Sequence, residues 1–167
     1  MSAPSPGFRV GQGIDVHGFS DDPGRPLVLG GVTVPGAPGL AGHSDADALS
    51  HALADALLGA AGLGDIGRHF PDDDPAWAGA DSTALLASVV TRVAEAGWRA
   101  VNADCTVVAE RPRLAGHAPA MAQRLSDVVG APVSVKATGP EGLGALGRGE
   151  GIAAVAVVLM VASPGSS

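Results

Sequence analysis

Two short segments of the sequence hold side chains that could bind a metal ion. Asp15 and His17 are two residues apart, so on a strand both side chains leave the same face. Farther along, His51 lies midway between Asp47 and Asp55 at spacings of four, which on a helix brings the three together. A solvated polar face is the ordinary interpretation of that second pattern. Two ligands from a strand and one from a helix, however, match a zinc site with an open fourth position.

A helix is expected to position His51. Ser44 is a suitable N-cap with Asp47 three residues on, and Gly62 follows the last apolar residue. His43 precedes this cap, where an imidazole can reach an anion at the helix N-terminus. The apolar positions recur at helical spacing and predict a core-facing stripe, with the two aspartates and His51 on the opposite face: Leu49, Leu53, Ala56, Leu57 and Ala60.

Length and composition indicate one domain over residues 1–167, with a core at about 8–162 and flexible termini. A formal net charge of −7 and the absence of Tyr argue against a nucleic-acid partner. Cys105 is the only cysteine, which favours a reducing compartment, and its apolar neighbours predict a buried, inert thiol. No signal peptide is evident, and the apolar run 152–162 is too short to span a bilayer, so we expect a soluble cytoplasmic protein with no membrane partner.

The remaining pattern predicts strands and helices in one mixed α/β (α+β) fold. A first strand over 8–17 is interrupted by Gly11 and Gly13, and a hairpin joins 27–29 to 32–34 through Gly30-Gly31. Further helices are expected after Asp81-Ser82 and over 118–129, and further strands over 104–109, 133–137 and 151–161. Residues 64–75 form either a solvated loop or a substrate-binding loop. The expected architecture is a two-layer sandwich of a mixed β-sheet with helices on one face. The last strand is apolar at consecutive positions, which predicts self-association through the other face.

Seven motifs in chain order carry a resemblance to a known family. They are Asp15-Val16-His17, His43-Ser44-Asp45-Ala46-Asp47, Ala56-Leu57-Leu58-Gly59-Ala60, Gly64-Asp65-Ile66-Gly67, Phe70-Pro71-Asp72, Val135-Lys136-Ala137-Thr138 and Gly147-Arg148-Gly149-Glu150-Gly151. Over about 8–162 the chain resembles the 2-C-methyl-D-erythritol 2,4-cyclodiphosphate synthases of the non-mevalonate isoprenoid pathway.

This resemblance implies a homotrimer with active sites between subunits, and a lyase reaction. In that reaction 4-diphosphocytidyl-2-C-methyl-D-erythritol 2-phosphate, a cytidine diphosphate-type substrate, cyclises and releases CMP. The substrate's 2-phosphate is the nucleophile, so no Ser, Cys or His nucleophile is required from the protein. A metal-dependent phosphohydrolase and a non-catalytic trimeric binding module are the alternatives, and product analysis and metal content separate them.

The resemblance also implies roles for individual residues. Zinc would be held by Asp15, His17 and His51, and a second divalent cation, Mg²⁺ or Mn²⁺, would lie near Glu141. His43, Thr138 and Glu141 would be catalytic, with Ser44 and Arg148 at phosphates; Arg148 and Glu150 also lie where the family lines its trimer axis. Erythritol and ribose would contact Asp65, Ile66, Gly67, Phe70, Pro71, Asp72, Asp73 and Asp74. Cytosine would be wrapped by Ala109, Glu110, Arg111, Pro112, Arg113, Leu114 and Ala115 of a neighbouring subunit. Asp47 and Asp55 would be structural, and His69 and His117 would have no role.

One segment departs from the family pattern. Thr138-Gly139-Pro140-Glu141 stands where the family usually has Thr-Thr-Thr-Glu, so a hydroxyl expected to stabilise the reacting phosphorus is missing. We expect Gly139 to adopt a positive φ and to direct its own N–H toward the phosphates as a replacement.

Overall fold

The computed structural model describes residues 7–71 and 73–163, and a four-stranded mixed sheet is its largest element. The strand order is β1-β6-β4-β5, with β6 antiparallel to both of its neighbours and β5 parallel to β4. A separate hairpin is formed by β2 and β3. The strands are β1 (Phe8–Gly18), β2 (Pro26–Leu29), β3 (Val32–Pro38), β4 (Trp98–Val108), β5 (Val133–Thr138) and β6 (Gly151–Ala162). The mixed sheet is confirmed, but β4 begins at Trp98 rather than at residue 104.

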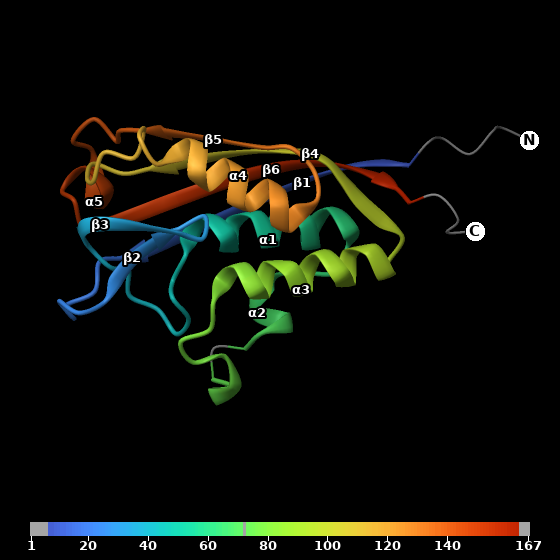
Figure 1. Ribbon diagram of the computed structural model, residues 1–167, viewed down its shortest axis with the longest axis horizontal. Coiled ribbons are helices and arrows are strands. Elements are labelled where there is room, and N and C mark those ends of the chain that lie inside the picture. The colour runs from blue at the N-terminus through green and yellow to red at the C-terminus, as the bar shows by residue number, and fades with distance from the viewer. Residues whose placement is uncertain (1–6, 72, 164–167) are drawn as a thin grey trace, which may run out of the picture.

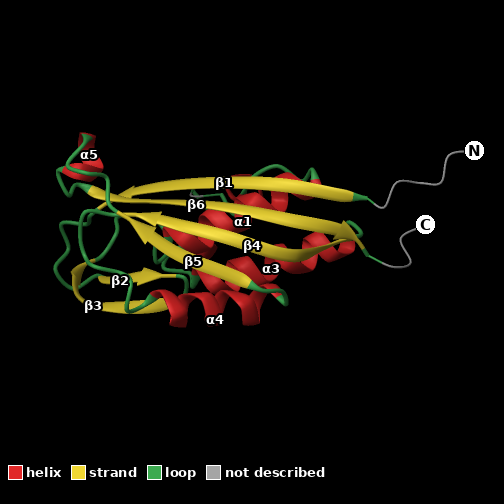
Figure 2. Ribbon diagram, turned by 90° about the horizontal axis from the view of Figure 1, so that it is seen from above, coloured by secondary structure: helices red, strands yellow, loops and turns green. Residues whose placement is uncertain are grey.

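Helices cover one face of this sheet, as predicted (Figure 1). The other face is open, and in Figure 2 the strands lie in front of the helices. The helices are α1 (Ala48–Ala61), α2 (Ile66–His69), η1 (Pro75–Trp77), α3 (Ser82–Glu95), α4 (Ala118–Val129) and α5 (Gly144–Gly147). Within the described residues, none of these helices has the length and apolar character needed to cross a membrane. Part of the segment 64–75, predicted as a loop, is helical, because Ile66–His69 form α2; η1 begins at its last residue, Pro75.

Helix α1 lies between the sheet and α3 and is apolar on nearly every side. It begins later than predicted, because its N-cap is Asp47, whose carboxylate accepts the N–H of Ser50. The Ser44 hydroxyl instead accepts the Ala46 N–H in the preceding loop. The end of the helix at Gly62, in a left-handed conformation, is as predicted.

Asp47 is fully buried, so the expectation that it lies on a polar face is wrong. Its two carboxylate oxygens accept the N–H groups of Gly30 and Gly31 at 2.8 and 2.7 Å, and the N–H and hydroxyl of Ser50 at 3.0 and 2.7 Å. A buried carboxylate is tolerated because these donors replace water. Asp47 therefore joins the turn of the β2–β3 hairpin to the start of α1, which is the structural role the resemblance implied.

Gly11 and Gly13 do not interrupt β1, contrary to the sequence prediction. Both face α1, where a Cβ on either residue would overlap the backbone of Ala56 or Ala52. The glycines thus let the strand approach the helix more closely than any other residue would allow.

The outward face of the sheet carries large apolar side chains. Phe8, Val10, Ile14 and Val16 are 57–70% exposed, and they alternate along β1 with the residues that face α1. On β6, Val157 is exposed on the same outward face. The described chain leaves this surface in solvent.

Candidate metal centre and substrate pockets

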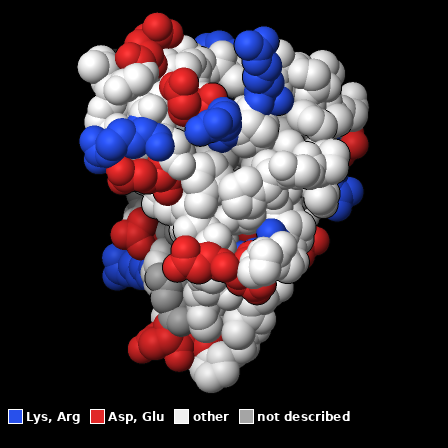
Figure 3. Space-filling view, turned by 90° about the vertical axis from the view of Figure 1, so that its left-hand side faces the viewer, with Lys and Arg blue, Asp and Glu red and all other residues white. Residues whose placement is uncertain are grey.

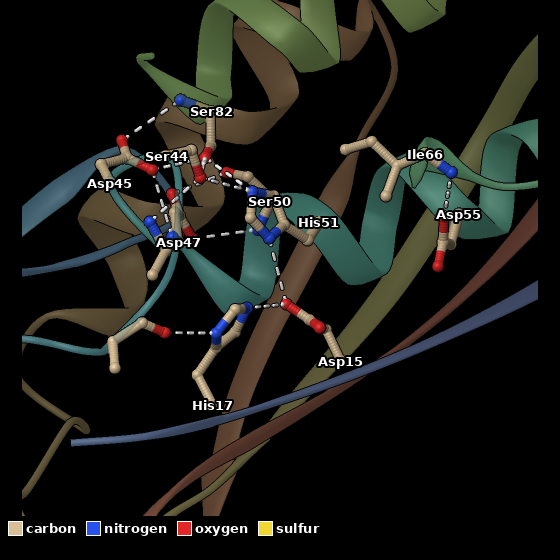
Figure 4. Close-up of polar contacts among 12 residues, drawn as sticks. Asp15, His17, Ser44, Asp45, Asp47, Ser50, His51, Asp55, Ile66 and Ser82 are labelled. Atoms are coloured by element: carbon tan, nitrogen blue, oxygen red, sulfur yellow. Dashed lines mark hydrogen bonds and ion pairs between the residues drawn. The ribbon is translucent and has the colours of Figure 1, made fainter. Parts of the chain in front are cut away.

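The carboxylate of Asp15 lies between two imidazoles (Figure 4). Asp15 Oδ2 is 2.8 Å from His17 Nε2 and 3.1 Å from His51 Nδ1. One potential ligand atom from each residue lies within 4.8 Å of the other two. Strand β1 supplies two of these side chains and α1 supplies the third, as the sequence pattern predicted.

A hydrogen bond on the side of the His17 imidazole away from Asp15 indicates which ring nitrogen carries the proton. His17 Nδ1 is 2.7 Å from the carbonyl oxygen of Ala41, which can only accept, so Nδ1 carries the proton. In the neutral ring Nε2 is then an unprotonated lone pair directed at a carboxylate. Either a proton on Nε2 or a metal ion must therefore lie between His17 and Asp15, and the donor set fits a metal ion in that position.

The pKa values of the site follow from the same contacts. Burial raises the pKa of Asp15, but hydrogen bonds and charge interactions with His17 and His51 outweigh it and hold this pKa well below the usual value. The hydrogen bond to Asp15 raises the pKa of His17, against a smaller opposite effect of burial. Asp15 is therefore an anion at neutral pH, which is the form that binds a metal.

A pocket of about 190 Å³ opens beside the three residues. His43 and Ser44 line it from the loop before α1, and Ile66 and Gly67 line it from α2. Its apolar wall contains Phe70, whose ring contacts that of Trp77 edge-on at 5.0 Å between centroids. The pocket therefore joins the three candidate metal ligands to the loop in which the sequence predicted substrate contacts.

The segment that carries α2 is held by two aspartates. Asp55 of α1 accepts the N–H of Ile66 at 2.7 Å, and Asp65 caps α2 by accepting the N–H of Arg68 at 2.9 Å. Farther along, Asp74 caps η1, and its carbonyl oxygen lies 3.2 Å from His43 Nε2. Pro71 and Asp73 are exposed. Asp72, also predicted as a site residue, lies outside the described residues.

The predicted cytosine-binding residues line a different pocket. It has a volume of about 270 Å³, and Thr138 and Gly139 form part of its wall. Leu114 is 3% exposed, so its side chain belongs to the core and it offers the pocket mainly backbone. Arg111 faces a third cavity, which Pro112 and Arg113 also line. The residues that line the 270 Å³ pocket are Ala109, Glu110, Pro112, Arg113, Leu114, Ala115, Ala137, Thr138 and Gly139. In one chain, the predicted metal-binding residues and the predicted nucleotide-binding residues therefore line separate pockets.

Comparison with known proteins decides the family. The model of the YgbB family matches residues 8–161. The chain belongs to the YgbB family. It is 58% identical over 156 residues to the 2-C-methyl-D-erythritol 2,4-cyclodiphosphate synthase of Bordetella petrii, covering 92% of this chain and 95% of that protein. It is 60% identical over 154 residues to the synthase of the same name from Symbiobacterium thermophilum, covering 90% and 97%. The chain is thus an enzyme, a phosphorus–oxygen lyase of this family.

Solved structures agree with this assignment. The bifunctional IspDF of Campylobacter jejuni superposes with a TM-score of 0.90 at 41% identity, over 95% of this chain, which spans 43% of that longer protein. The Plasmodium falciparum IspF–CDP complex superposes with a TM-score of 0.81 at 29% identity, and the match covers 95% of this chain and 99% of that one. A 2C-methyl-D-erythritol-2,4-cyclodiphosphate synthase in a CDP-bound form superposes with a TM-score of 0.81 at 39% identity. That match covers 91% of this chain and 99% of the other.

Two further predicted residues of this YgbB-family chain lie near the end of the molecule that holds α5. Glu141 is exposed and has a left-handed backbone, with a φ of 55°. Arg148 pairs with Glu150 at 2.5 Å, and both side chains are exposed. Figure 3 looks onto this end, where basic and acidic side chains are intermixed.

The expectation of a positive φ at Gly139 is wrong. The left-handed residues of this loop are Glu141, Gly142 and Gly144. An added Cβ at Gly139 would lie 3.7 Å from Glu141 Oε1, which is an ordinary contact. A side chain is therefore permitted at Gly139. Without a positive φ, the backbone conformation no longer supports the idea that the Gly139 N–H replaces the missing hydroxyl.

Sequence reasoning missed several residues that line the candidate site or contact it. Trp77 and Leu85 line the pocket beside the three candidate metal ligands, and Ser82 contacts His51. The sequence signal for Ser82 is ambiguous, because Asp81-Ser82 is also a typical helix-capping pair. Cys105 is buried as predicted, and burial raises the pKa of its thiol to about 12. His69 and His117 are partly buried and line none of the cavities described above.

Proposed function

We propose that this chain converts 4-diphosphocytidyl-2-C-methyl-D-erythritol 2-phosphate into 2-C-methyl-D-erythritol 2,4-cyclodiphosphate and CMP, in the biosynthesis of isoprenoid precursors. The observation that supports this most directly is the convergence of Asp15, His17 and His51 on one edge of a pocket that His43 and Ser44 also line. The names of the relatives, and the CDP held by two of the similar structures, support the substrate class.

The proposed metal is one zinc ion per chain, held by Asp15, His17 and His51. Bound there, zinc would offer its open position to a phosphate oxygen and stabilise charge on the phosphorus. A second divalent cation, Mg²⁺ or Mn²⁺, is proposed near Glu141, whose exposed carboxylate is a suitable hard oxygen ligand.

In this reaction the protein positions one phosphate against another. An oxygen of the substrate's 2-phosphate forms a bond to the β-phosphorus, and the bond from that phosphorus to the oxygen bridging the α-phosphorus breaks, so that CMP leaves with the electron pair. In its imidazolium form His43 keeps its Nε2–H on the Asp74 carbonyl and donates its Nδ1–H to a phosphate oxygen, and the Ser44 hydroxyl donates to a second one. Phe70, Trp77 and Leu85 form an apolar wall that disfavours water as the competing nucleophile.

The complete site is proposed to form between copies of the chain in a homotrimer, with Ala109–Ala115 and Thr138 of a neighbour binding the cytidine. Two observations support this. The outward apolar side chains of β1 require cover, and the two predicted halves of the site lie in different pockets of one chain. The single-domain organisation and a cytoplasmic location stay predictions.

Incubation of the purified protein with the cytidyl substrate, Zn²⁺ and Mg²⁺ tests the reaction. We expect CMP and a cyclic diphosphate with two coupled ³¹P resonances. A linear phosphate product would instead identify a phosphohydrolase, and no conversion despite bound metal would favour a binding module.

The metal assignment has its own test in His51→Ala, with His117→Ala as the matched histidine control. His51→Ala should lose most zinc and activity while keeping its circular dichroism spectrum, because it leaves the apolar contacts of α1 in place. Full zinc occupancy in purified His51→Ala protein would rule out the assigned ligand set.

A further inference from the structure

His51 contacts a chain of polar groups on the side away from Asp15. Its Nε2 lies 2.8 Å from the hydroxyl oxygen of Ser82, and that hydroxyl donates to Asp45 Oδ1 (Figure 4). Ser82 is the first residue of α3 and is 1% exposed. The proposed function assigns no role to Ser82 or to Asp45.

The direction of these hydrogen bonds follows from counting protons. An ionised carboxylate only accepts, so the single hydroxyl proton of Ser82 goes to Asp45. The Ser82 oxygen is then an acceptor toward His51, and the proton between them must belong to Nε2. As a consequence, Nδ1 of the neutral ring keeps its lone pair and presents it to Asp15 and to any metal ion.

Asp45 itself is held so that it cannot reverse this direction. Its Oδ1 also accepts the Asp47 N–H at 3.1 Å, and its Oδ2 accepts the Ser82 N–H at 3.2 Å. Its own N–H donates to the Ala80 carbonyl at 3.1 Å. With three donors directed at its two oxygens, the Asp45 side chain is fixed as an acceptor.

We propose that Ser82 and Asp45 are positioning residues that fix His51 as the Nε2-protonated tautomer, so that Nδ1 is the metal-binding atom. His17 is fixed the opposite way, with Nδ1 donating to Ala41 and Nε2 facing the metal. Outer hydrogen bonds of this kind commonly change metal affinity 10- to 100-fold. The proposal rests on the metal centre of the proposed function and adds to it Ser82 of α3 and Asp45 of the loop before α1.

Ser44 is a weaker second acceptor for the same proton. Its hydroxyl oxygen lies 3.2 Å from His51 Nε2 and also accepts the Ala46 N–H. Removal of the Ser82 hydroxyl should therefore weaken the orientation of His51 without abolishing it.

The first test is zinc affinity, measured by competition with a chromophoric chelator on full-length protein. Ser82→Ala should lower the affinity at least about 10-fold. Thr83→Val is the matched control, because Thr83 is a buried neighbour whose hydroxyl donates to Asp81 and does not contact His51. Affinities of Ser82→Ala and Thr83→Val within twofold of the unchanged protein would overturn the proposal. Failure of the unchanged protein to hold zinc would instead overturn the metal centre.

The second test needs no variant. Long-range ¹H–¹⁵N spectra of the zinc-loaded protein report which nitrogen of each histidine carries the proton. We expect a protonated Nε2 for His51 and a protonated Nδ1 for His17. A His51 ring protonated at Nδ1, or coordinated through Nε2, would refute the assignment.

Asp45→Asn provides a third measurement. An amide must direct its NH₂ group at one of the donors that Asp45 accepts, so the hydrogen-bond chain loses its fixed direction. We expect a loss of zinc affinity at least as large as that of Ser82→Ala and a change in the His51 Nε2–H resonance. An unchanged resonance and unchanged affinity would contradict the role of Asp45.

Discussion

Gly13 of β1 lies against Ala52 of α1 with no space for a side chain between them, because an added Cβ would overlap the Ala52 carbonyl. Asp15 and His17 follow on the same face of β1, and His51 precedes Ala52 on α1. The close approach at Gly13 thus sets the separation between the strand and the helix that together hold the proposed metal.

Gly13→Ala should therefore reduce zinc affinity as well as stability. The strand must move away from α1 to admit the methyl group, and overpacking of this kind costs about 1–3 kcal/mol. Chemical unfolding gives the stability, and chelator competition gives the affinity. Gly59→Ala is the control, because an added Cβ there meets nothing within 4 Å. It should raise the free energy of unfolding by roughly 0.5–1 kcal/mol through helix propensity. A Gly13→Ala protein with unchanged zinc affinity would contradict this relationship.

Val10→Glu should disrupt self-association. Val10 is 70% exposed on the outward face of β1, so a charge there is harmless in a monomer but unfavourable in an apolar interface. Analytical ultracentrifugation should show a trimer for the unchanged protein and smaller species for Val10→Glu, with little activity. Thr91→Glu, on an exposed part of α3, is the control and should stay trimeric. A fully active monomer would disprove both the interface and the shared site.

Asp81→Ala should destabilise the protein in a pH-dependent way. Asp81 caps α3, and the hydrogen bond from the Thr83 hydroxyl is the main reason why the pKa of Asp81 lies below its usual value. A lowered folded pKa means that the stabilisation is complete above the unfolded value near 3.9 and is lost as the pH falls through the folded value. We expect a loss of about 1 kcal/mol at pH 7 that shrinks below about pH 4. Asp21→Ala, in an exposed turn, should change little at either pH, and a pH-independent deficit in Asp81→Ala would refute the argument.

Glu141→Gly should make the protein more stable and less active. A left-handed conformation costs a non-glycine residue roughly 1 kcal/mol, and Glu141 has a φ of 55°. Glycine relieves that strain but removes the carboxylate proposed to hold the second cation. Urea unfolding should show a gain of up to about 1 kcal/mol, while Mg²⁺-dependent turnover is lost. Glu141→Gln, which keeps the strain, should lose turnover with no gain in stability; a Glu141→Gly protein of normal turnover would exclude the carboxylate role.

The sequence predicted those parts of the fold that depend on local periodicity. Helices at 118–129 and after Asp81, the Gly30-Gly31 hairpin and the mixed sheet are confirmed. The sequence-based prediction failed where contacts between residues far apart in the chain determine the environment of a side chain. Nothing local indicates that Asp47 is buried beneath the hairpin turn, because its donors are Gly30 and Gly31, far upstream in the chain. The three candidate metal ligands were predictable from local spacing, because residues two apart on a strand, or four apart on a helix, lie on the same face. Ser82 was not, because its contact with His51 depends on how α3 packs against α1.

The placement of two half-sites in separate pockets of one chain has a genetic consequence. If neighbouring copies complete each other's sites, a chain defective at His51 and a chain defective at Arg113 can each supply what the other lacks. Random co-assembly of the two inactive proteins would give roughly a quarter of the interfaces both intact halves. Two alleles that are separately inactive would then complement each other in the same cell.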